Sequence, residues 1–346
     1  MFYLKYRPHT IQSLDNSAVK EMLSALVSQK EVPHALLFVG QKGTGKTSTA
    51  RIVAKAVNCL NNRFSGKGNS SEPCNACANC MAIDSGSSPD VVEMDAASNR
   101  GIDQIRQITH EASFAPIAGR YRAYIIDEAH MITAEGFNAL LKTLEEPPET
   151  ILFILATTNE EKIPKTIISR CIRINFGTAK NADIASMIKR IAREEHVTVS
   201  DELIKLITTN ADHSFRDATK ILEELVIQNK LDLEKAQTYL GMRTRNNLLE
   251  ILSHKPLSDA LAWSEHYFAQ GGSAKTILTE TLSQLHDILL EQHHVITPEH
   301  TAIHLKPKQV VALMKLFTEA YQLSRISPVE SLPLEIAIVE FYNQKL

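Results

Sequence analysis

Gly40-Gln41-Lys42-Gly43-Thr44-Gly45-Lys46-Thr47 is the stretch that decides the fold of this chain. It fits the pattern G-x-x-x-x-G-K-[ST], in which glycines let the backbone wrap around a polyphosphate. The apolar run 35–39 before it is typical of a buried parallel strand, and residues 48–57 after it have helical composition and spacing. Strand, loop and helix in this order predict a phosphate-binding loop, because backbone N–H groups at the helix start stabilise negative charge.

Each residue type in this loop has a task at a nucleotide. Lys46 would reach the β and γ phosphates, and the Thr47 hydroxyl would complete the shell of a Mg²⁺ ion. The alternative is a surface turn rich in glycine, lysine and threonine, which the flanking strand and helix disfavour. We expect the cofactor-binding residues here to be Gly40, Gln41, Lys42, Gly43, Thr44, Gly45, Lys46, Thr47 and Ser48.

Length and composition indicate a soluble globular chain. The 346 residues exceed one ordinary domain and fit two or three. Lysine and arginine number 37 against 40 aspartate and glutamate, a net charge of −3, so any contact with nucleic acid must use a local patch. No apolar run approaches the length of a membrane span, and residues 1–5 lack the layout of a secretory signal. We therefore expect a cytoplasmic protein without membrane contact.

The first half alternates strand and helix patterns, which predicts an α/β fold with an open parallel sheet covered by helices on both faces. The strand candidates are 35–39, 91–94, 121–126, 151–156 and 171–176. Helical spacing takes over from Ala179. After Gly241 two further stripes indicate a helical bundle or an oligomerisation surface; they consist of Leu278, Leu282, Leu285 and Leu289, and of Val310, Leu313, Met314, Phe317 and Tyr321.

An apolar strand, Tyr124-Ile125-Ile126, ends in two adjacent carboxylates. Asp127 at the strand tip would hold Mg²⁺ through water, and Glu128 would polarise the attacking water as general base. Together with the phosphate loop upstream, this pair favours ATP hydrolysis over simple binding. The letters Asp127-Glu128-Ala129-His130 are also those of a helicase box, so a helicase is a rival interpretation.

Four of the five cysteines follow the spacing Cys59-x14-Cys74-x2-Cys77-x2-Cys80. Thiolates this close in sequence can close a tetrahedral shell around Zn²⁺, and a site with four cysteines is structural because no position is left open for water. Buried or reactive thiols without metal are the alternative. The overlapping C-x-x-C units favour zinc.

Three polar positions lie beyond the fourth strand candidate. Thr157-Thr158-Asn159 follows that strand, Arg170 stands in Ser169-Arg170-Cys171, and Arg216 stands in Ser214-Phe215-Arg216-Asp217 near a helix start. A polar residue beside the carboxylates can orient the attacking water, and an arginine can neutralise charge that develops on the γ-phosphate. Read alone, each arginine is more often a surface ion-pair residue.

Taken together, the motifs resemble the AAA+ ATPases, and specifically the gamma/tau family of bacterial DNA polymerase III clamp-loader subunits. The resemblance covers residues 1–240 closely and the last hundred by helical pattern. Where that family usually carries a Val-Gly-Gln type stretch near the adenine, this chain has Leu14-Asp15-Asn16-Ser17. The resemblance is carried by Tyr6-Arg7-Pro8, the phosphate loop, the four cysteines, Asp95-Ala96-Ala97-Ser98, Asp127-Glu128, the run from Phe137 to Pro148, Ala156-Thr157-Thr158, Ser169-Arg170-Cys171 and Phe215-Arg216-Asp217-Ala218.

The resemblance implies domains and roles. It implies an AAA+ ATPase domain over 1–178 with a four-cysteine zinc module at 59–80, a helical lid over 179–242 and an all-helical collar over 243–346. Thr158 would be sensor 1, Arg216 sensor 2 in the same subunit, and Arg170 a finger that reaches a neighbour's ATP. The catalytic set is then Lys46, Asp127, Glu128, Thr158, Arg170 and Arg216, with Tyr6 and Arg7 at the nucleotide and Ser98, Asn99 and Arg100 at template-strand phosphates.

The implied function is that of an ATP-dependent motor subunit that loads a sliding clamp onto primer-template DNA within the DNA polymerase III holoenzyme. Its cofactors would be ATP, Mg²⁺ and Zn²⁺; its partners would be the delta and delta-prime subunits, further gamma/tau copies, the beta clamp and DNA. A delta-prime type subunit is the nearest rival, but it typically has a degraded phosphate loop, whereas Lys46 and Thr47 are intact. The other rivals are a helicase or branch-migration motor and a nucleotide-binding scaffold without turnover. The end at Leu346 fits a natural short form or a truncated chain.

Overall fold

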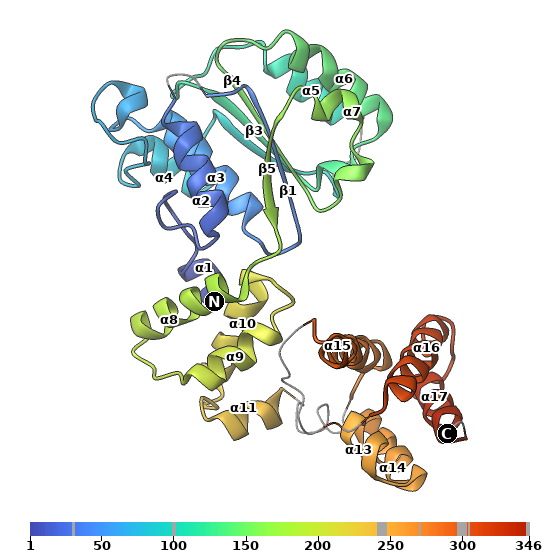
Figure 1. The fold of residues 1–346 in the computed structure, drawn as a ribbon. Coiled ribbons are helices and arrows are strands. Elements are labelled where there is room, and N and C mark those ends of the chain that lie inside the picture. Colours follow the sequence, from blue (N-terminus) through green and yellow to red (C-terminus); the bar gives the residue numbers. More distant parts are fainter. Residues whose placement is uncertain are drawn as a thin grey trace. The chain divides into compact units, whose positions relative to one another are not determined.

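Five parallel strands form the sheet of the first half, as the computed structural model in Figure 1 shows. The described residues are 1–29, 32–98, 102–240, 248–269, 271–295, 303 and 305–343. The strands are β1 (Ala35–Gly40), β2 (Val91–Asp95), β3 (Arg122–Asp127), β4 (Ile151–Thr157) and β5 (Ile172–Gly177), in the spatial order β2-β3-β4-β1-β5. All five predicted strands are confirmed, and each observed start and end lies within one residue of the predicted one.

Helices cover both faces of this sheet (Figure 1). Leu36 and Phe38 of β1 pack into a core with α2 (Ser17–Val27) and α3 (Lys46–Asn58), whereas Leu37 packs into a second core with α5 (Ile102–Glu111), α6 (Ala134–Glu145) and α7 (Lys165–Ile168). Successive side chains of a strand point to opposite faces, so a sheet buried on both sides needs continuous apolar strands. This is why the strands are continuous apolar runs in the sequence.

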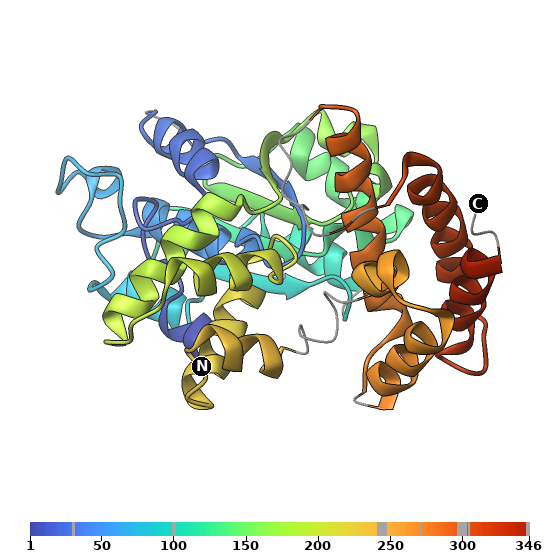
Figure 2. The same ribbon diagram turned by 60° about the horizontal axis from the view of Figure 1, so that its bottom comes forward.

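Three helices follow the sheet: α8 (Asn181–Glu194), α9 (Asp201–Thr209) and α10 (Phe215–Ile227). Serines at the starts of α9 and α10 accept hydrogen bonds from backbone N–H groups of the first turn, which fixes where these helices begin. The N-terminal helix α1 (Phe2–Lys5) contacts α10, and Figure 2 shows the N terminus beside these helices. Shorter elements of the same unit are η1 (Arg63–Ser65), α4 (Ala78–Asp84), η2 (Ala129–Met131) and η3 (Glu160–Lys162).

The described chain divides into two compact units, Met1–Leu231 and Asp232–Leu346. The second unit consists of helices: α11 (Leu233–Tyr239), α13 (Leu248–His254), α14 (Leu257–Ala269), α15 (Ala274–Gln292), α16 (Pro307–Leu323) and α17 (Leu332–Asn343). Both predicted apolar stripes lie on helices of this unit, on α15 and α16, and pack into its core. The expected boundary between residues 242 and 243 lies outside the described residues, and the three-domain division stays a prediction.

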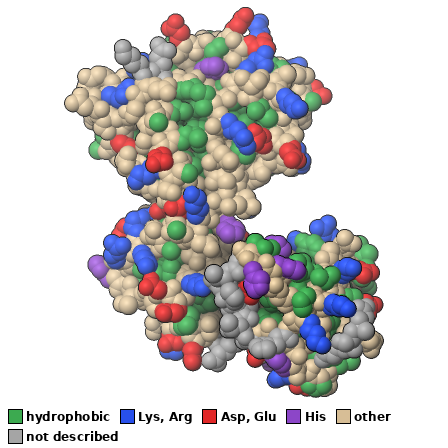
Figure 3. All heavy atoms as spheres, viewed as in Figure 1, with side chains coloured by type: hydrophobic (Ala, Val, Ile, Leu, Met, Phe, Trp, Pro, Cys, Tyr) green, Lys and Arg blue, Asp and Glu red, His purple; other side chains and the backbone are tan. Residues whose placement is uncertain are grey.

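The surface carries charges of both signs. Acidic and basic side chains are interspersed over the face drawn in Figure 3. Among the described residues, the helices are all too short or too polar to cross a membrane. The near-neutral composition is therefore reflected in a mixed surface on this face.

Two buried polar side chains hold the backbone that enters β3. Asp90 accepts hydrogen bonds from the N–H groups of residues 117, 118 and 119 at 2.6–2.7 Å. Asn58, the last residue of α3, accepts from those of residues 120 and 121 at 2.8–2.9 Å. Five consecutive N–H groups thus bind two side chains that are 1% and 3% exposed. A carboxylate and an amide that are buried in this way need hydrogen-bond partners from the protein.

Asp90→Ala should lower the free energy of unfolding of the first unit by about 3 kcal/mol, because three hydrogen bonds to an ionised acceptor are lost at once. Circular dichroism during urea unfolding measures the loss. Asp103→Ala, at an aspartate that is 92% exposed, is the control and should cost less than about 1 kcal/mol. Equal stability of the two variants would contradict the role given to Asp90.

Candidate active site

A cavity of about 270 Å³ lies in the first unit where the phosphate loop meets the end of β3. It is bordered by three parts of the chain: the loop with its helix start, the two carboxylates, and a rim from the N-terminal segment and the helices after the sheet. Its lining residues include Tyr3, Tyr6, Arg7, Leu14, Asp15, residues 42–49, Asp127, Glu128, Met187, Phe215 and Arg216. The phosphate loop, the carboxylate pair and Arg216, which are far apart along the chain, are therefore brought to one cavity.

The loop itself is held open by its glycines. Gly43 has φ of +79° and Gly45 has φ of +95°, a left-handed conformation that side chains with a Cβ rarely adopt. A Cβ on Gly43 would lie 1.9 Å from Ser214 Oγ, so the loop packs tightly against the start of α10. Helix α3 begins at Lys46 with no side chain capping its N terminus. Its first N–H groups are thus available to an anion.

Lys46 is folded back onto its own loop. Its Nζ donates to the carbonyl oxygens of Gly40 and Gln41, both at 2.8 Å. These two residues do not line the cavity, so their part in the predicted nucleotide site is to hold Lys46. Burial lowers the pKa of Lys46, and the nearby Asp127 and Glu128 carboxylates oppose that shift. Polyphosphate oxygens carry negative charge, so they would bind this buried ammonium more strongly than the neutral carbonyl oxygens do.

Two arginines add positive charge to the cavity. Burial lowers the pKa of Arg7, and the cations Arg51 and Arg216 lower it further. Arg216 lies at the start of α10, and its guanidinium is 5.1 Å from the ring centroid of Tyr3. The backbone N–H of Arg216 donates to the Gly43 carbonyl at 3.4 Å. The predicted sensor 2 residue therefore faces the phosphate loop of its own chain. Mutual repulsion among these cations favours an anion between them.

The two carboxylates have different neighbours. Asp127 Oδ2 accepts from the Thr47 hydroxyl at 2.5 Å, so the two predicted Mg²⁺ ligands are in direct contact. Glu128 has φ of +48°, a conformation that is rare outside glycine and occurs at functional sites. The Thr158 hydroxyl donates to Glu128 Oε2 at 3.2 Å, and His130 Nδ1 lies 3.4 Å from the same oxygen. Glu128 is thus held at the cavity wall by two side chains.

Arg170 lies away from this cavity. Strands β1 and β5 are parallel, with Leu36 opposite Ile172 and Gly40 opposite Gly177. Arg170 precedes β5, whereas the phosphate loop follows β1, so they occupy opposite ends of strands about 20 Å long. The guanidinium pairs with Glu145 of α6 at 2.5 Å and donates to the Thr166 carbonyl at 2.7 Å. The arginine cannot serve the phosphate loop of its own chain from this position.

The predicted DNA contacts are covered only in part. Ser98 is exposed, and its hydroxyl donates to Asp95 Oδ2 at 3.1 Å. Asn99 and Arg100 lie outside the described residues. Helix α5 begins just after them, at Ile102.

The adenine end of the predicted site departs from the family pattern. Asp15 lines the cavity, and both of its oxygens accept from Arg190 Nη2, at 2.9 and 3.1 Å. Burial raises the pKa of Asp15, against the effect of Arg190. Asn16 caps α2 and donates to the Phe176 carbonyl at 3.1 Å. The hydroxyl of Tyr6 binds Glu195 at the end of α8. These bonds tie the N-terminal segment to the helices after the sheet.

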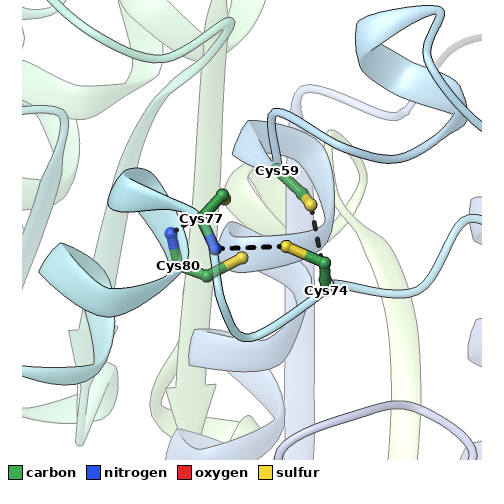
Figure 4. Close-up of side chains that lie close together, drawn as sticks. All are labelled: Cys59, Cys74, Cys77 and Cys80. Atoms are coloured by element: carbon green, nitrogen blue, oxygen red, sulfur yellow. Dashed lines mark hydrogen bonds between the residues drawn. The ribbon is translucent and has the colours of Figure 1, made fainter.

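The four clustered cysteines come together in space, as Figure 4 shows. Their sulfur atoms all lie within 4.8 Å of one another. Tetrahedral zinc with Zn–S bonds of about 2.3 Å places its sulfurs about 3.8 Å apart, so the cluster fits that ion. Cys59 follows directly after α3, while Cys77 caps α4 and Cys80 lies within it. The segment Cys59–Cys80, here called the cysteine module, is therefore attached directly to the phosphate-loop helix.

Backbone N–H groups point at these sulfurs. The N–H of Cys74 donates to Cys59 Sγ and that of Cys77 to Cys74 Sγ, both at 3.3 Å. Hydrogen bonds from the backbone, Ala76 foremost, lower the pKa of Cys74 to about 6, whereas burial raises the pKa of Cys80. Metal binds thiolates, and donors aimed at sulfur favour the thiolate form. The fifth cysteine, Cys171, lies elsewhere, and burial raises its pKa to about 12.

Three contacts of the site were not predicted from the sequence. His130 contacts Glu128, Ser214 packs on Gly43, and Glu145 holds Arg170. In the sequence, His130 stands out only as a letter of the helicase box, and its closeness to Glu128 along the chain is the one signal of this contact. Ser214 is 171 positions from Gly43 in the sequence, and Arg170 is 25 positions from Glu145. Only the fold brings them together.

A phosphate loop, a carboxylate pair at the tip of a parallel strand and a helical segment that closes the cavity define a P-loop ATPase of the AAA+ class. A point variant of RuvB from Thermotoga maritima has the same fold, with a TM-score of 0.50 at 15% identity over 79% of this chain and 87% of that chain. At that identity the likeness concerns the fold alone.

Sequence comparison identifies the family. The protein-family model for the DNA polymerase III delta subunit matches residues 15–180. The gamma subunit of Buchnera aphidicola (subsp. Baizongia pistaciae) is 34% identical over 290 residues, covering 82% of this chain and 77% of the relative. The tau subunit of Bacillus subtilis is 40% identical over 300 residues, covering 83% of this chain and 51% of the relative. The chain belongs to the DNA polymerase III gamma/tau family and spans about half the length of the tau relative.

Proposed function

We propose that this chain is the ATP-hydrolysing motor subunit of a bacterial clamp loader. It would bind ATP with Mg²⁺ in the cavity at the phosphate loop and couple ATP turnover to loading a sliding clamp onto primer-template DNA. One observation carries the proposal: Lys46, Thr47, Asp127 and Glu128 line a single cavity in a chain of the gamma/tau family. A delta-prime type subunit would not need this intact set.

The residues of the cavity divide the chemistry among them. Lys46 and Arg216 would bind the β and γ phosphates, with Lys46 exchanging its loop carbonyls for phosphate oxygens. Thr47 and Asp127 would hold Mg²⁺, which neutralises phosphate charge when bound. Glu128 would accept the proton of the attacking water, and Thr158 would keep that carboxylate oriented, as its 3.2 Å hydrogen bond suggests.

Arg170 would act on the ATP of a neighbouring subunit. Its position at the far end of β5 from the phosphate loop supports action between chains, because no side chain spans that distance. The ion pair with Glu145 would have to open when a neighbour docks. Hydrolysis would then depend on correct assembly of the loader.

The other parts of the chain would serve assembly and DNA. The helices 179–242 would act as a lid on the nucleotide, and 243–346 as a collar that joins delta, delta-prime and further gamma/tau copies. Ser98, Asn99 and Arg100 would contact template phosphates, and the net charge of −3 means that such a contact must use a local patch. The cysteine module would hold one structural Zn²⁺ through Cys59, Cys74, Cys77 and Cys80. ATP turnover that rises with primer-template DNA plus a sliding clamp would distinguish a loader from a helicase.

Lys46→Ala and Glu128→Gln should fail in different ways. Lys46→Ala should lose ATP binding, because the phosphate cradle loses its buried cation. Glu128→Gln should bind ATP normally and hydrolyse it roughly 10²–10⁴-fold more slowly, because only water activation is removed. Equilibrium binding and steady-state hydrolysis by the assembled loader measure both. Unchanged hydrolysis in Glu128→Gln would refute the assignment of the general base.

Mixing two inactive variants tests Arg170. Arg170→Ala alone should lower turnover on the order of 10³-fold or more. A mixture of Arg170→Ala and Lys46→Ala chains contains some complete sites. At these interfaces the Arg170→Ala chain binds ATP, and the Lys46→Ala chain supplies the arginine. Activity of the mixture should exceed that of either variant. If the mixture stays inactive although the variants demonstrably co-assemble, Arg170 does not act between subunits.

Metal analysis tests the cysteine module. Protein purified without chelators should carry one Zn²⁺ per chain, and its removal should lower the melting temperature while leaving ATP affinity nearly unchanged, since metal binding free energy is folding free energy. The sulfur atoms, at the far end of α3 from Lys46, have no contact with the phosphate site. A chain purified in this way without zinc would contradict the assignment.

A further inference from the structure

One buried lysine joins the phosphate-loop helix to the cysteine module. Lys55 lies in the last turn of α3 and is 1% exposed. A lysine is almost never buried without partners, because removing the ammonium from water is costly. Its Nζ donates to Asn75 Oδ1 at 2.9 Å and lies 2.8 and 3.0 Å from the two oxygens of Asp84. Two hydrogen bonds and an ion pair therefore hold this ammonium between Asn75 and Asp84.

Both acceptors belong to the segments that carry the cysteines. Asn75 stands between Cys74 and Cys77 and has φ of +57°, the left-handed conformation that turns the chain there. Asp84 is the last residue of α4, the helix that Cys77 caps and that contains Cys80. The remaining cysteine, Cys59, directly follows the helix on which Lys55 itself lies. The lysine thus touches each of the three pieces of chain that bring sulfur to the cluster.

From this arrangement we propose that Lys55 is the positioning residue of the cysteine module. It holds the turn at Asn75 and the end of α4 against α3, so that the four sulfur atoms lie together before metal binds. Lys55 does not touch the metal, and its ion pair with Asp84 leaves little net charge, so its effect is on geometry. The inference rests on the proposed zinc site and concerns a residue outside the four ligands.

A neighbouring arginine provides a matched control. Arg51 lies one turn before Lys55 on α3, and both line the same smaller cavity of about 160 Å³. Arg51 also forms an ion pair, but with Glu93 of β2 at 2.6 Å, which does not belong to the cysteine module. Arg51→Met and Lys55→Met therefore remove the same kind of contact from the same helix. Only the second releases the segments that carry cysteine.

The test measures zinc affinity of the full chain by competition with a chromogenic chelator. Lys55→Met should weaken zinc binding on the order of tenfold or more, the usual effect of losing a residue that orients metal ligands. Asn75→Gly should act in the same direction, because glycine keeps the left-handed turn and removes only the side-chain acceptor. Arg51→Met should bind zinc as the wild type does. Asn75→Gly carries the test if Lys55→Met does not fold.

Stability measured with and without zinc separates positioning from a general role in the fold. If Lys55 positions the module, its substitution should lower the melting temperature more in the zinc-loaded than in the zinc-free protein. Wild-type zinc affinity in both Lys55→Met and Asn75→Gly, or equal losses in the two forms, would overturn the proposal. Failure of the wild type to bind zinc would overturn the zinc site and this inference together, whereas ATP binding would still test the proposed motor separately.

Discussion

Helix α3 has two tasks at its two ends. The phosphate loop and the cysteine module of the first unit both depend on its position. Its N terminus must stay uncapped so that an anion can bind, and its C terminus ends at the first cysteine of the module. Thirteen residues, about 20 Å of helix, separate the two ends. The helix can hold this position because its apolar side packs on the sheet, as Ile52 and Val53 do. The unsatisfied N–H groups at its start are then a fixed feature of the folded chain.

The parallel sheet turns this local feature into a division of labour. Every strand points the same way, so the carboxyl ends of β1 and β3 bring the phosphate loop and Asp127 together. The same rule sends the residues before β5 to the opposite end, where Arg170 lies. One end of the sheet thus holds the proposed nucleotide site, and Arg170 lies at the other end. Strand direction alone therefore places Arg170 at the end of the sheet from which it would act on a neighbouring subunit.

Local patterns were enough for part of this architecture. The five strands, the glycine-rich loop between β1 and α3 and the closeness of the four cysteines are confirmed, because each is encoded in residues that are adjacent or regularly spaced. The contacts that set the geometry were not: Lys55 with Asp84, Ser214 with Gly43 and Glu145 with Arg170 join separate elements. The sequence does carry a signal for the contact of Lys55 with Asp84, because Lys55 stands among apolar residues of its helix. Asn99 and Arg100 lie outside the described residues, so their contacts with DNA stay predictions.

Each group that the proposed chemistry needs is held by a partner within the chain. Lys46 binds loop carbonyls, Glu128 accepts from Thr158, and Arg170 pairs with Glu145. The Arg170 pair is a surface pair, with side chains 32% and 49% exposed, and such pairs contribute only about 0–1 kcal/mol. A finger that accelerates turnover about 10³-fold corresponds to about 4 kcal/mol of transition-state stabilisation. If Arg170 acts as proposed, exchanging Glu145 for a phosphate in a neighbour would therefore cost little compared with what the exchange gains, and the pair with Glu145 would hold the arginine in place until a neighbour docks.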